Sequence, residues 1–224
     1  MKKCIVSLGT KNSRYVDGLA RLSNSLRDNA DGIDFLGFIH EASVGAPLHI
    51  ESNYGFKVHA IQKAIDAGYT QILWLDASVY AAAPVQPIFD IIEQQGYWFE
   101  GAGCWLGEWT NDRTLAYYNL DRDSAMSLPM VQSGFMGFDM EGRGNLLFAY
   151  LKRAYENGLF KGSWNNDDRS QGDERCLGHR HDQSCMSAIL AYDYPFSHLP
   201  EYIQYAGIYD QILNEKIIFK CQGI

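Results

Sequence analysis

The sequence predicts an α/β fold in which a mainly parallel central sheet carries helices on both faces. In the first hundred residues, short apolar segments alternate with segments whose apolar residues recur at helical spacing. This order is typical of parallel strands joined by crossover helices. The chain has 224 residues and shows no internal repeat, low-complexity tract or long linker. We therefore expect a single domain, residues 1–224, built around one continuous core.

The first strand–helix–strand unit is predicted from apolar patterns. Residues 4–8 form a short apolar segment that ends at Gly9 and Thr10, as a buried strand does where it enters a loop. Apolar residues recur at roughly helical spacing over 14–28, which predicts a helix. Residues 34–39 then form the second predicted strand.

A second helix and a third strand follow. Residues 56–67 place apolar side chains on one face, and Gly68 comes next, where a helix C-cap belongs. Residues 71–75 form the third predicted strand, apolar from 72 to 75, which stops at Asp76. Parallel strands end at the same edge of a sheet, and such sheets bind ligands there. We therefore expect Asp76 to lie on the same rim as the loop after the first strand.

The rest of the chain is less regular. Prolines at 84 and 87 predict the start of a helix that Gly96 closes, and residues 97–100 follow as a strand. Residues 101–127 have no clear period and are expected to form loops around one short helix. The pattern then predicts one strand over 130–140 and helices over 145–157 and 182–192.

Composition and charge exclude several classes of protein. The formal net charge of −8 argues against a nucleic-acid-binding protein, which needs a basic face. No segment approaches the roughly 20 apolar residues of a membrane span, and the first residues do not resemble a signal peptide. Five cysteines without paired spacing indicate reduced thiols rather than disulfides or a zinc site. We expect a soluble protein of the cytoplasm.

Asp76 and Ser78 are the most informative pair. A carboxylate at the end of a buried strand is costly unless it is hydrated, paired or bound to a cation. Ser78 lies two residues on, and alternate side chains of an extended segment share a face. Oxygen ligands together with substrate phosphates are the usual way to hold Mg²⁺ or Mn²⁺. The alternative is that Asp76 only caps the following turn and Ser78 is exposed.

Five segments together resemble the GT-A-type glycosyltransferases, which use nucleotide-sugar donors. They are residues 7–10, 54–57, 72–78, 132–138 and 181–183, so the resemblance covers most of the chain. It implies a single Rossmann-like GT-A domain, with residues 1–100 as the nucleotide-binding half and 101–224 as the acceptor-binding half. In this family an Asp-x-Asp motif holds the metal that bridges the donor diphosphate. Here Ser78 stands where the second acid would be, which makes Asp76 the firm ligand and Ser78 a weak one.

The resemblance also assigns roles to other residues. Mn²⁺ or Mg²⁺ would be the cofactor, with Asp76, Ser78 and His181 as candidate ligands. The nucleotide sugar, by default UDP-linked, would be contacted by a set drawn from both halves of the chain: Gly9, Thr10, Lys11, Lys57, Asp76, Ala77, Ser78 and Arg180. Ser133, Gly134 and Trp105 would contact a glycan or glycoprotein acceptor. For Lys57, a solvated position on the polar face of its helix is an equally good interpretation.

The cluster from His179 to Gln183 is the second group of polar residues. Asp182 is a good N-cap for the helix that follows, so the cluster could be an exposed loop ending in that cap. The resemblance instead places Asp182 beside the transferred sugar, as the base for the acceptor hydroxyl or as a carboxylate facing the anomeric carbon. Arg180 could pair with a diphosphate oxygen in a bidentate manner.

The function predicted on this basis is metal-dependent transfer of a sugar from a nucleoside diphosphate to a glycan or protein hydroxyl. Growing charge on the diphosphate would be stabilised by the cation and basic side chains. Two alternatives stay open from the sequence. One is a metal-dependent hydrolase that uses His179, His181 and Asp182. The other is a non-catalytic module that binds a nucleotide sugar, which the incomplete acidic motif would allow.

Overall fold

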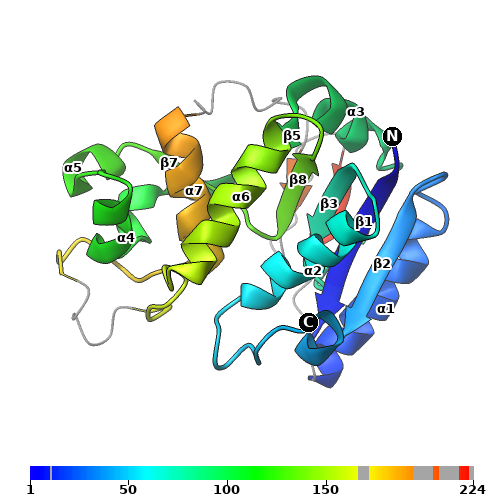
Figure 1. The fold of residues 1–224 in the computed structure, drawn as a ribbon, viewed down its shortest axis with the longest axis horizontal. Coiled ribbons are helices and arrows are strands. Elements are labelled where there is room, and N and C mark those ends of the chain that lie inside the picture. The colour runs from blue at the N-terminus through cyan, green and yellow to red at the C-terminus, as the bar shows by residue number, and fades with distance from the viewer. Residues whose placement is uncertain (11, 166–171, 194–203, 207–216, 222–224) are drawn as a thin grey trace.

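The computed structural model describes residues 1–10, 12–165, 172–193, 204–206 and 217–221. A five-stranded sheet of order β2-β1-β3-β8-β5 lies at its centre (Figure 1). Its strands are β1 (Lys3–Gly9), β2 (Asp34–Ile39), β3 (Gln71–Leu75), β5 (Tyr97–Trp98) and β8 (Phe135–Asp139). β1 pairs in parallel with both β2 and β3, whereas β8 runs antiparallel to β3 and β5. The predicted α/β class with a mainly parallel sheet is confirmed.

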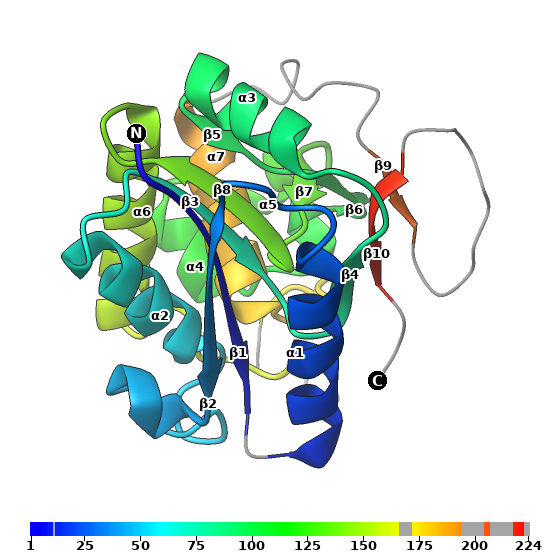
Figure 2. The ribbon, with the colours of Figure 1, turned by 90° about the vertical axis from the view of Figure 1, so that its right-hand side faces the viewer.

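Helices cover both faces of this sheet (Figure 2). One face carries α1 (Ser13–Leu26) and α3 (Gln86–Gln95), and the other carries α2 (Gly55–Asp66), α6 (Arg143–Glu156) and α7 (His181–Asp193). Alternate strand side chains enter the two cores. Ile5 and Leu73 pack with the α1 and α3 residues, whereas Val6 and Trp74 pack with those of α2, α6 and α7.

Two predicted helix ends are confirmed by the backbone. Gly68, directly after the C-cap of α2, has a φ of +81°, and Gly96, the C-cap of α3, has a φ of +87°. Side chains with a Cβ rarely adopt this left-handed conformation, so glycine ends these helices at low cost.

The expected strand over 130–140 is two strands in two different sheets. β7 (Pro129–Val131) pairs with β6 (Gly101–Trp105), whereas β8 pairs with β3 and β5 in the central sheet. The two strands are separated only by the polar residues 132–134, and so short a polar interruption does not reveal that the pairing partner changes there. β8 also lies between strands of the first hundred residues, so the central sheet is completed by a strand from the second half of the chain.

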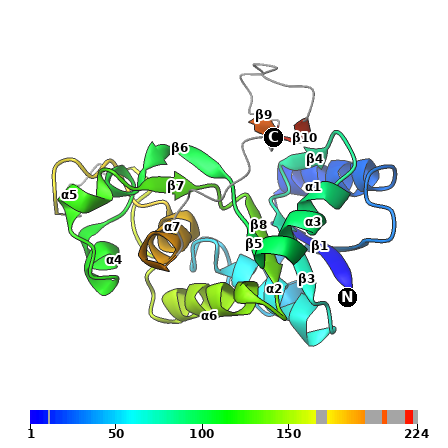
Figure 3. The same ribbon diagram turned by 90° about the horizontal axis from the view of Figure 1, so that it is seen from above.

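Residues 101–127 contain more structure than the expected loops and single short helix. Besides β6 they form η2 (Leu106–Glu108), α4 (Asp112–Tyr117) and α5 (Arg122–Ala125). These elements are short, and the apolar period of one or two turns is too brief to stand out in a sequence. With β7 they form a lobe on the far side of α7 from the central sheet (Figure 3).

A small sheet lies beside the end of β3. β4 (Val79–Ala81) pairs antiparallel with β10 (Ile217–Cys221), which pairs with β9 (Gln204–Ala206). A 3₁₀ turn, η1 (Glu41–Val44), follows β2. Through β10, residues near the end of the chain reach the segment directly after Asp76.

Candidate active site

A pocket opens at the carboxyl end of β3, between the central sheet and the start of α7. Its lining residues come from six separate segments of the chain: Tyr54, Asp76, Ser78, Val79, Gln132, Ser133, Gly134, Phe135, Trp164, Arg180, Asp182, Gln183 and Cys221. Six of them, counting Asp76, Ser78 and Asp182, are residues that the sequence predicts for the site. Ligands of open α/β sheets bind at this kind of rim.

A buried lysine joins the two carboxylates of this pocket. Lys57 Nζ lies 3.0 Å from Asp76 Oδ1 and 2.9 Å from Asp182 Oδ2. It also donates to the backbone carbonyl of Ser133 at 2.9 Å. An ammonium group has three N–H donors, so these three acceptors engage all of them. Lys57 therefore fixes three elements of the site, β3, α7 and the segment before β8, to the first turn of α2.

The charge state of Lys57 follows from this arrangement. Its side chain is only 1% exposed, which excludes the solvated position that the sequence left open. Burial by itself lowers the pKa of a lysine, but Asp182 and Asp76 reverse that effect and raise the pKa of Lys57 above its usual value. The lysine is thus charged, and one positive group faces two negative ones.

The remaining oxygen of Asp76 faces a gap that glycine leaves open. Oδ1 accepts from Trp74 Nε1 at 2.8 Å as well as from Lys57. A Cβ on Gly134 would lie 3.4 Å from Oδ2, and the Asp76 amide donates to the Gly134 carbonyl at 2.9 Å. Gly134 therefore keeps the space beside the Asp76 carboxylate free for a ligand.

Two helices of the site begin at residues in the left-handed conformation. Tyr54, the N-cap of α2, has a φ of 56°, and His181, the first residue of α7, has a φ of 52°. Their rings lie 5.5 Å apart. Such strained residues cost about 1–3 kcal/mol each and persist where the surrounding structure enforces them, often at functional sites. Here they precede the helices that bear Lys57 and Asp182.

Arg180, directly before α7, lines the pocket together with Asp182 and Gln183, and we call this side of the pocket the α7 wall. Arg180 lies there against two tryptophans. Its guanidinium carbon is 4.0 Å from the ring centroid of Trp109 and 5.1 Å from that of Trp164. Its Nη1 points to the thiol sulfur of Cys104 at 3.8 Å. No carboxylate among the residues that the structure describes forms an ion pair with Arg180, and its Nε is buried without a hydrogen-bond partner.

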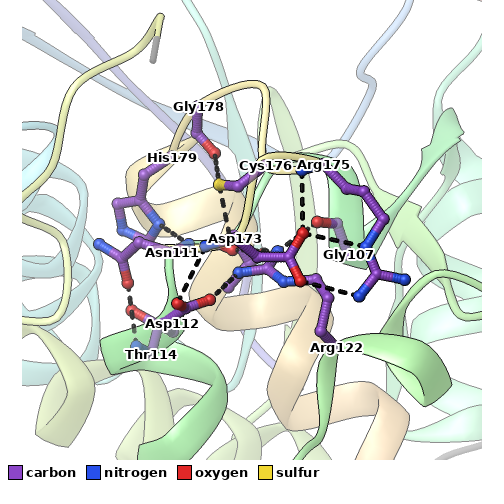
Figure 4. A network of polar contacts seen from close by, with 11 residues as sticks. Gly107, Asn111, Asp112, Thr114, Arg122, Asp173, Arg175, Cys176, Gly178 and His179 are labelled. Carbon is purple, nitrogen blue, oxygen red and sulfur yellow. Dashed lines mark hydrogen bonds and ion pairs between the residues drawn. The ribbon is translucent and has the colours of Figure 1, made fainter. Parts of the chain in front are cut away.

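A polar network holds the segment that leads into Arg180 (Figure 4). Asp112 accepts from Arg122 and from the Asp173 amide, and Arg175 pairs with Asp173 and Asp123 at 2.8 Å each. Further along, buried His179 accepts from the Asn111 amide and donates to the Leu159 carbonyl. Residues 172–179 are thus tied to α4, α5 and the end of α6.

Solved structures resemble this chain over nearly its whole length. Mouse xyloside xylosyltransferase 1, in its apo form, matches with a TM-score of 0.54 at 11% identity, covering 99% of this chain and 97% of the mouse chain. A glycosyltransferase involved in glycosylation of the major capsid protein of PBCV-1 matches with a TM-score of 0.50 at 12% identity, covering 99% and 93%. No family model and no curated protein sequence matches the chain.

The chain has the GT-A fold. The architecture implied by the sequence motifs is therefore confirmed. At 11% and 12% sequence identity, the two solved structures show the fold of this chain and not its activity.

Within the GT-A fold, the pocket gathers only some of the predicted residues. Lys57 does not line the pocket itself but forms ion pairs with Asp76 and Asp182, which do. Gly9 ends β1 and Thr10 follows it, on the same rim as Asp76, but neither residue lines the pocket. Ala77 and Trp105 do not line it either. Lys11 lies outside the described residues. A Cβ on Gly9 would approach the Tyr15 carbonyl oxygen to 2.8 Å, so glycine is needed there for the close packing of α1.

The two histidines of the polar cluster are engaged elsewhere. His181 Nδ1 lies 2.8 Å from the Phe160 carbonyl oxygen, and the ring stacks with Trp164. His179 is fully buried, with one nitrogen on a backbone carbonyl and the other on a backbone amide. Burial lowers the pKa of both rings, for His179 to about 4. Neither ring lines the pocket, so the geometry does not favour a hydrolase built on them.

Some lining residues were not singled out from the sequence. Tyr54, Gln183 and Cys221 belong to this group, and they reach the pocket from α2, α7 and β10. Tyr54 and Gln183 lie in segments 54–57 and 181–183, which carry the family resemblance, and this is the signal that could have assigned them to the site. Cys221 reaches the pocket because β10 pairs with β4, a contact between distant parts of the sequence.

The donor set can be compared with what a divalent cation needs. Among the described residues, no group of three or more histidine, cysteine, aspartate or glutamate side chains converges on a metal site. Asp76 offers only Oδ2, and the Ser78 hydroxyl lies 3.4 Å from Cys221 Sγ. Mg²⁺ and Mn²⁺ favour carboxylate oxygens and retain substrate phosphates or water. One carboxylate oxygen and one hydroxyl do not fit a cation that the protein itself holds.

Proposed function

We propose that this protein is a glycosyltransferase that moves a sugar from a nucleoside diphosphate, UDP by default, to a hydroxyl of a glycan or glycoprotein. The observation that carries this proposal is the buried Lys57, which joins Asp76 and Asp182 at the ligand-binding rim of a GT-A fold. A charged lysine and two carboxylates are costly to bury, and a pocket that contains them is a candidate for chemistry rather than packing. Both structural neighbours are glycosyltransferases, one a xylosyltransferase and the other involved in capsid glycosylation, and this supports the same reaction class.

The proposed reaction breaks one C–O bond and forms another. The bond between the anomeric carbon and the diphosphate oxygen breaks, and its electron pair stays on the diphosphate. The acceptor oxygen forms the new bond to the anomeric carbon, and its proton passes to Asp182. Asp182 lines the pocket and is held in place by Lys57, so it is positioned toward the sugar rather than free to rotate.

The other predicted residues take roles by position. Ser133 and Gly134 form the floor beneath the sugar, where the missing Cβ of Gly134 leaves room beside Asp76. Gly9, Thr10 and Ala77 lie at the rim and would contact the nucleoside. Trp105 has a side chain that is 46% exposed and would contact the acceptor outside the pocket.

The predicted Mn²⁺ or Mg²⁺ requirement stays a prediction. The donor set described above does not fit a cation held by the protein, and no step of the proposed reaction depends on one. A non-catalytic nucleotide-sugar-binding module remains the alternative to a transferase, and turnover of the donor distinguishes the two.

Donor turnover tests the proposal. Wild-type protein and Asp76→Asn are incubated with a panel of nucleotide sugars, and the released nucleoside diphosphate is measured. We expect wild-type protein to release it from at least one donor and Asp76→Asn to be at least 100-fold slower while its circular dichroism is unchanged. Asp28→Asn, an exposed aspartate at the end of α1, is the matched control and should keep full activity. No release from any donor, or full activity of Asp76→Asn, would contradict the proposal.

A further inference from the structure

The α7 wall of the pocket carries hydrogen-bond donors that have no acceptor. Arg180 Nε and Gln183 Nε2 are both buried without a hydrogen-bond partner, and both residues line the pocket. The Gln183 side chain is only 6% exposed. Buried donors that lack an acceptor are costly, because they have lost water without gaining another partner. Their placement indicates that a ligand with acceptor oxygens completes this wall.

The charge of Arg180 points to an anionic ligand. The two carboxylates of the pocket share the ammonium of Lys57, whereas Arg180 forms no ion pair with any carboxylate in the described part of the chain. Its guanidinium carbon lies 4.0 Å over the Trp109 ring instead, an attraction that is weaker than an ion pair with a carboxylate or phosphate. The planar fork of an arginine matches two oxygens of a phosphate group.

The N-terminus of α7 adds positive electrostatic potential on the same side of the pocket as Arg180. This helix of 13 residues begins at His181, directly after Arg180, so its positive end faces the side of the pocket where Arg180 and Gln183 lie. A helix N-terminus alone would not identify a site. Here it coincides with a buried amide and a guanidinium that have no hydrogen-bonding or ion-pair carboxylate partner among the residues that the structure describes.

We propose that Arg180, Gln183 and the N-terminus of α7 bind the donor diphosphate and neutralise the charge that grows on it as the sugar leaves, so that transfer needs no divalent cation. This inference rests on the proposed function. It joins two independent observations: Asp76 and Ser78 are a poor donor set for a cation that the protein itself holds, and the α7 wall holds unused donors suited to an anion. The charge that a bound cation would stabilise is stabilised by fixed donors in a water-poor pocket.

Binding of nucleoside diphosphates without turnover tests the inference. UDP, GDP and ADP are titrated into the protein by calorimetry, once in EDTA and once in manganese chloride. For the nucleotide that binds, we expect dissociation constants that agree within about threefold in the two buffers. Arg180→Met should weaken binding at least 30-fold in both buffers, and Arg180→Lys should recover only part of the loss because it lacks the planar fork. Arg153→Met, at an exposed arginine in the last turn of α6, is the matched control and should bind like wild type.

The outcomes separate this inference from the proposed function. Binding that falls tenfold or more in EDTA would overturn it, and so would an Arg180→Met variant that binds like wild type. Electron paramagnetic resonance adds a direct readout, because the signal of free Mn²⁺ in a mixture with nucleotide should fall no further when wild-type protein is added. If wild-type protein binds none of the three nucleotides in either buffer, the proposed function itself fails, which a metal requirement alone would not cause.

Discussion

Lys57 shows how one side chain can determine the state of a whole site. Its ammonium is within 3.0 Å of two carboxylates and one carbonyl oxygen that come from three different elements. The sequence shows a lysine in the first turn of a helix and nothing that distinguishes it from a solvated one. Only the approach of β3 and α7 makes it buried, because both acids arrive from other parts of the chain.

Removing the charge of Lys57 should destabilise the fold strongly. Lys57→Met leaves Asp76 and the buried Asp182 without their cation, and breaking a buried ion pair from one side costs roughly 3–5 kcal/mol. Urea unfolding should show a loss of that size, whereas Lys63→Met, at an exposed lysine of the same helix, should change stability by about 0.5 kcal/mol or less. Adding Asp182→Asn to Lys57→Met should recover part of the loss. A single variant as stable as wild type would show that the ion pairs contribute little.

Gly134 is the second residue whose effect should be local. Gly134→Ala places a methyl group 3.4 Å from Asp76 Oδ2, in ordinary contact but inside the space left for the ligand. We expect nucleotide-sugar affinity to fall at least tenfold while the free energy of unfolding changes by about 1 kcal/mol or less. Calorimetry and urea unfolding measure the two effects. Gly101→Ala is the control, because a Cβ there meets nothing within 4 Å. Unchanged affinity in Gly134→Ala would place the sugar elsewhere.

At the scale of elements, the start of α7 depends on His179. Its ring lies between the Asn111 amide and the Leu159 carbonyl, and its own amide donates to the Ser163 carbonyl. Burial lowers the pKa of His179 to about 4. The ring thus stays neutral in the folded protein at pH values where an unfolded histidine takes up a proton.

This difference predicts a specific dependence of stability on pH. An unfolded histidine titrates near 6.5, so at neutral pH His179 has no effect, and as pH falls below about 6.5 the unfolded state gains a proton that the folded state does not. At pH 5 this should cost about 2 kcal/mol. His179→Gln cannot titrate and should lack this part of the loss. Unfolding free energies of both proteins between pH 7.5 and pH 5 measure it, and parallel curves would show that His179 is protonated in the fold.

The elements that the sequence predicts well are those with local signals. Helices with a long apolar face, and helix ends marked by Gly68 and Gly96, appear as expected. The error over 130–140 arose because only three polar residues, 132–134, separate two apolar segments whose partner strand changes from β6 to β3. β4 escaped prediction for a related reason, since its partner β10 lies about 140 residues away in the sequence.

At the scale of the whole molecule, the pocket forms where the two halves of the chain meet. Asp76 and Ser78 come from the first half, whereas Ser133, Arg180 and Asp182 come from the second. The sequence predicted these residues as site residues, because each lies in a recognisable sequence motif. It could not show that Lys57 joins the two acids, that Arg180 pairs with no carboxylate of the described residues, or that His181 faces a backbone carbonyl.

No helix among the described residues is long and apolar enough to cross a lipid bilayer.

The network around Asp112 and Arg122 fixes the lobe of α4 and α5 to the segment before α7. The α7 wall of the pocket is therefore held by this lobe as well as by the central sheet.

The position of a bound nucleotide sugar tests the account most directly. A crystal structure of wild-type protein with the donor that supports turnover should show the diphosphate within hydrogen-bond distance of Arg180 and Gln183 and the sugar beside Asp182 and Gly134. A diphosphate bound away from both the α7 wall and the end of β3 would contradict the assignment of this pocket as the place where the sugar is transferred.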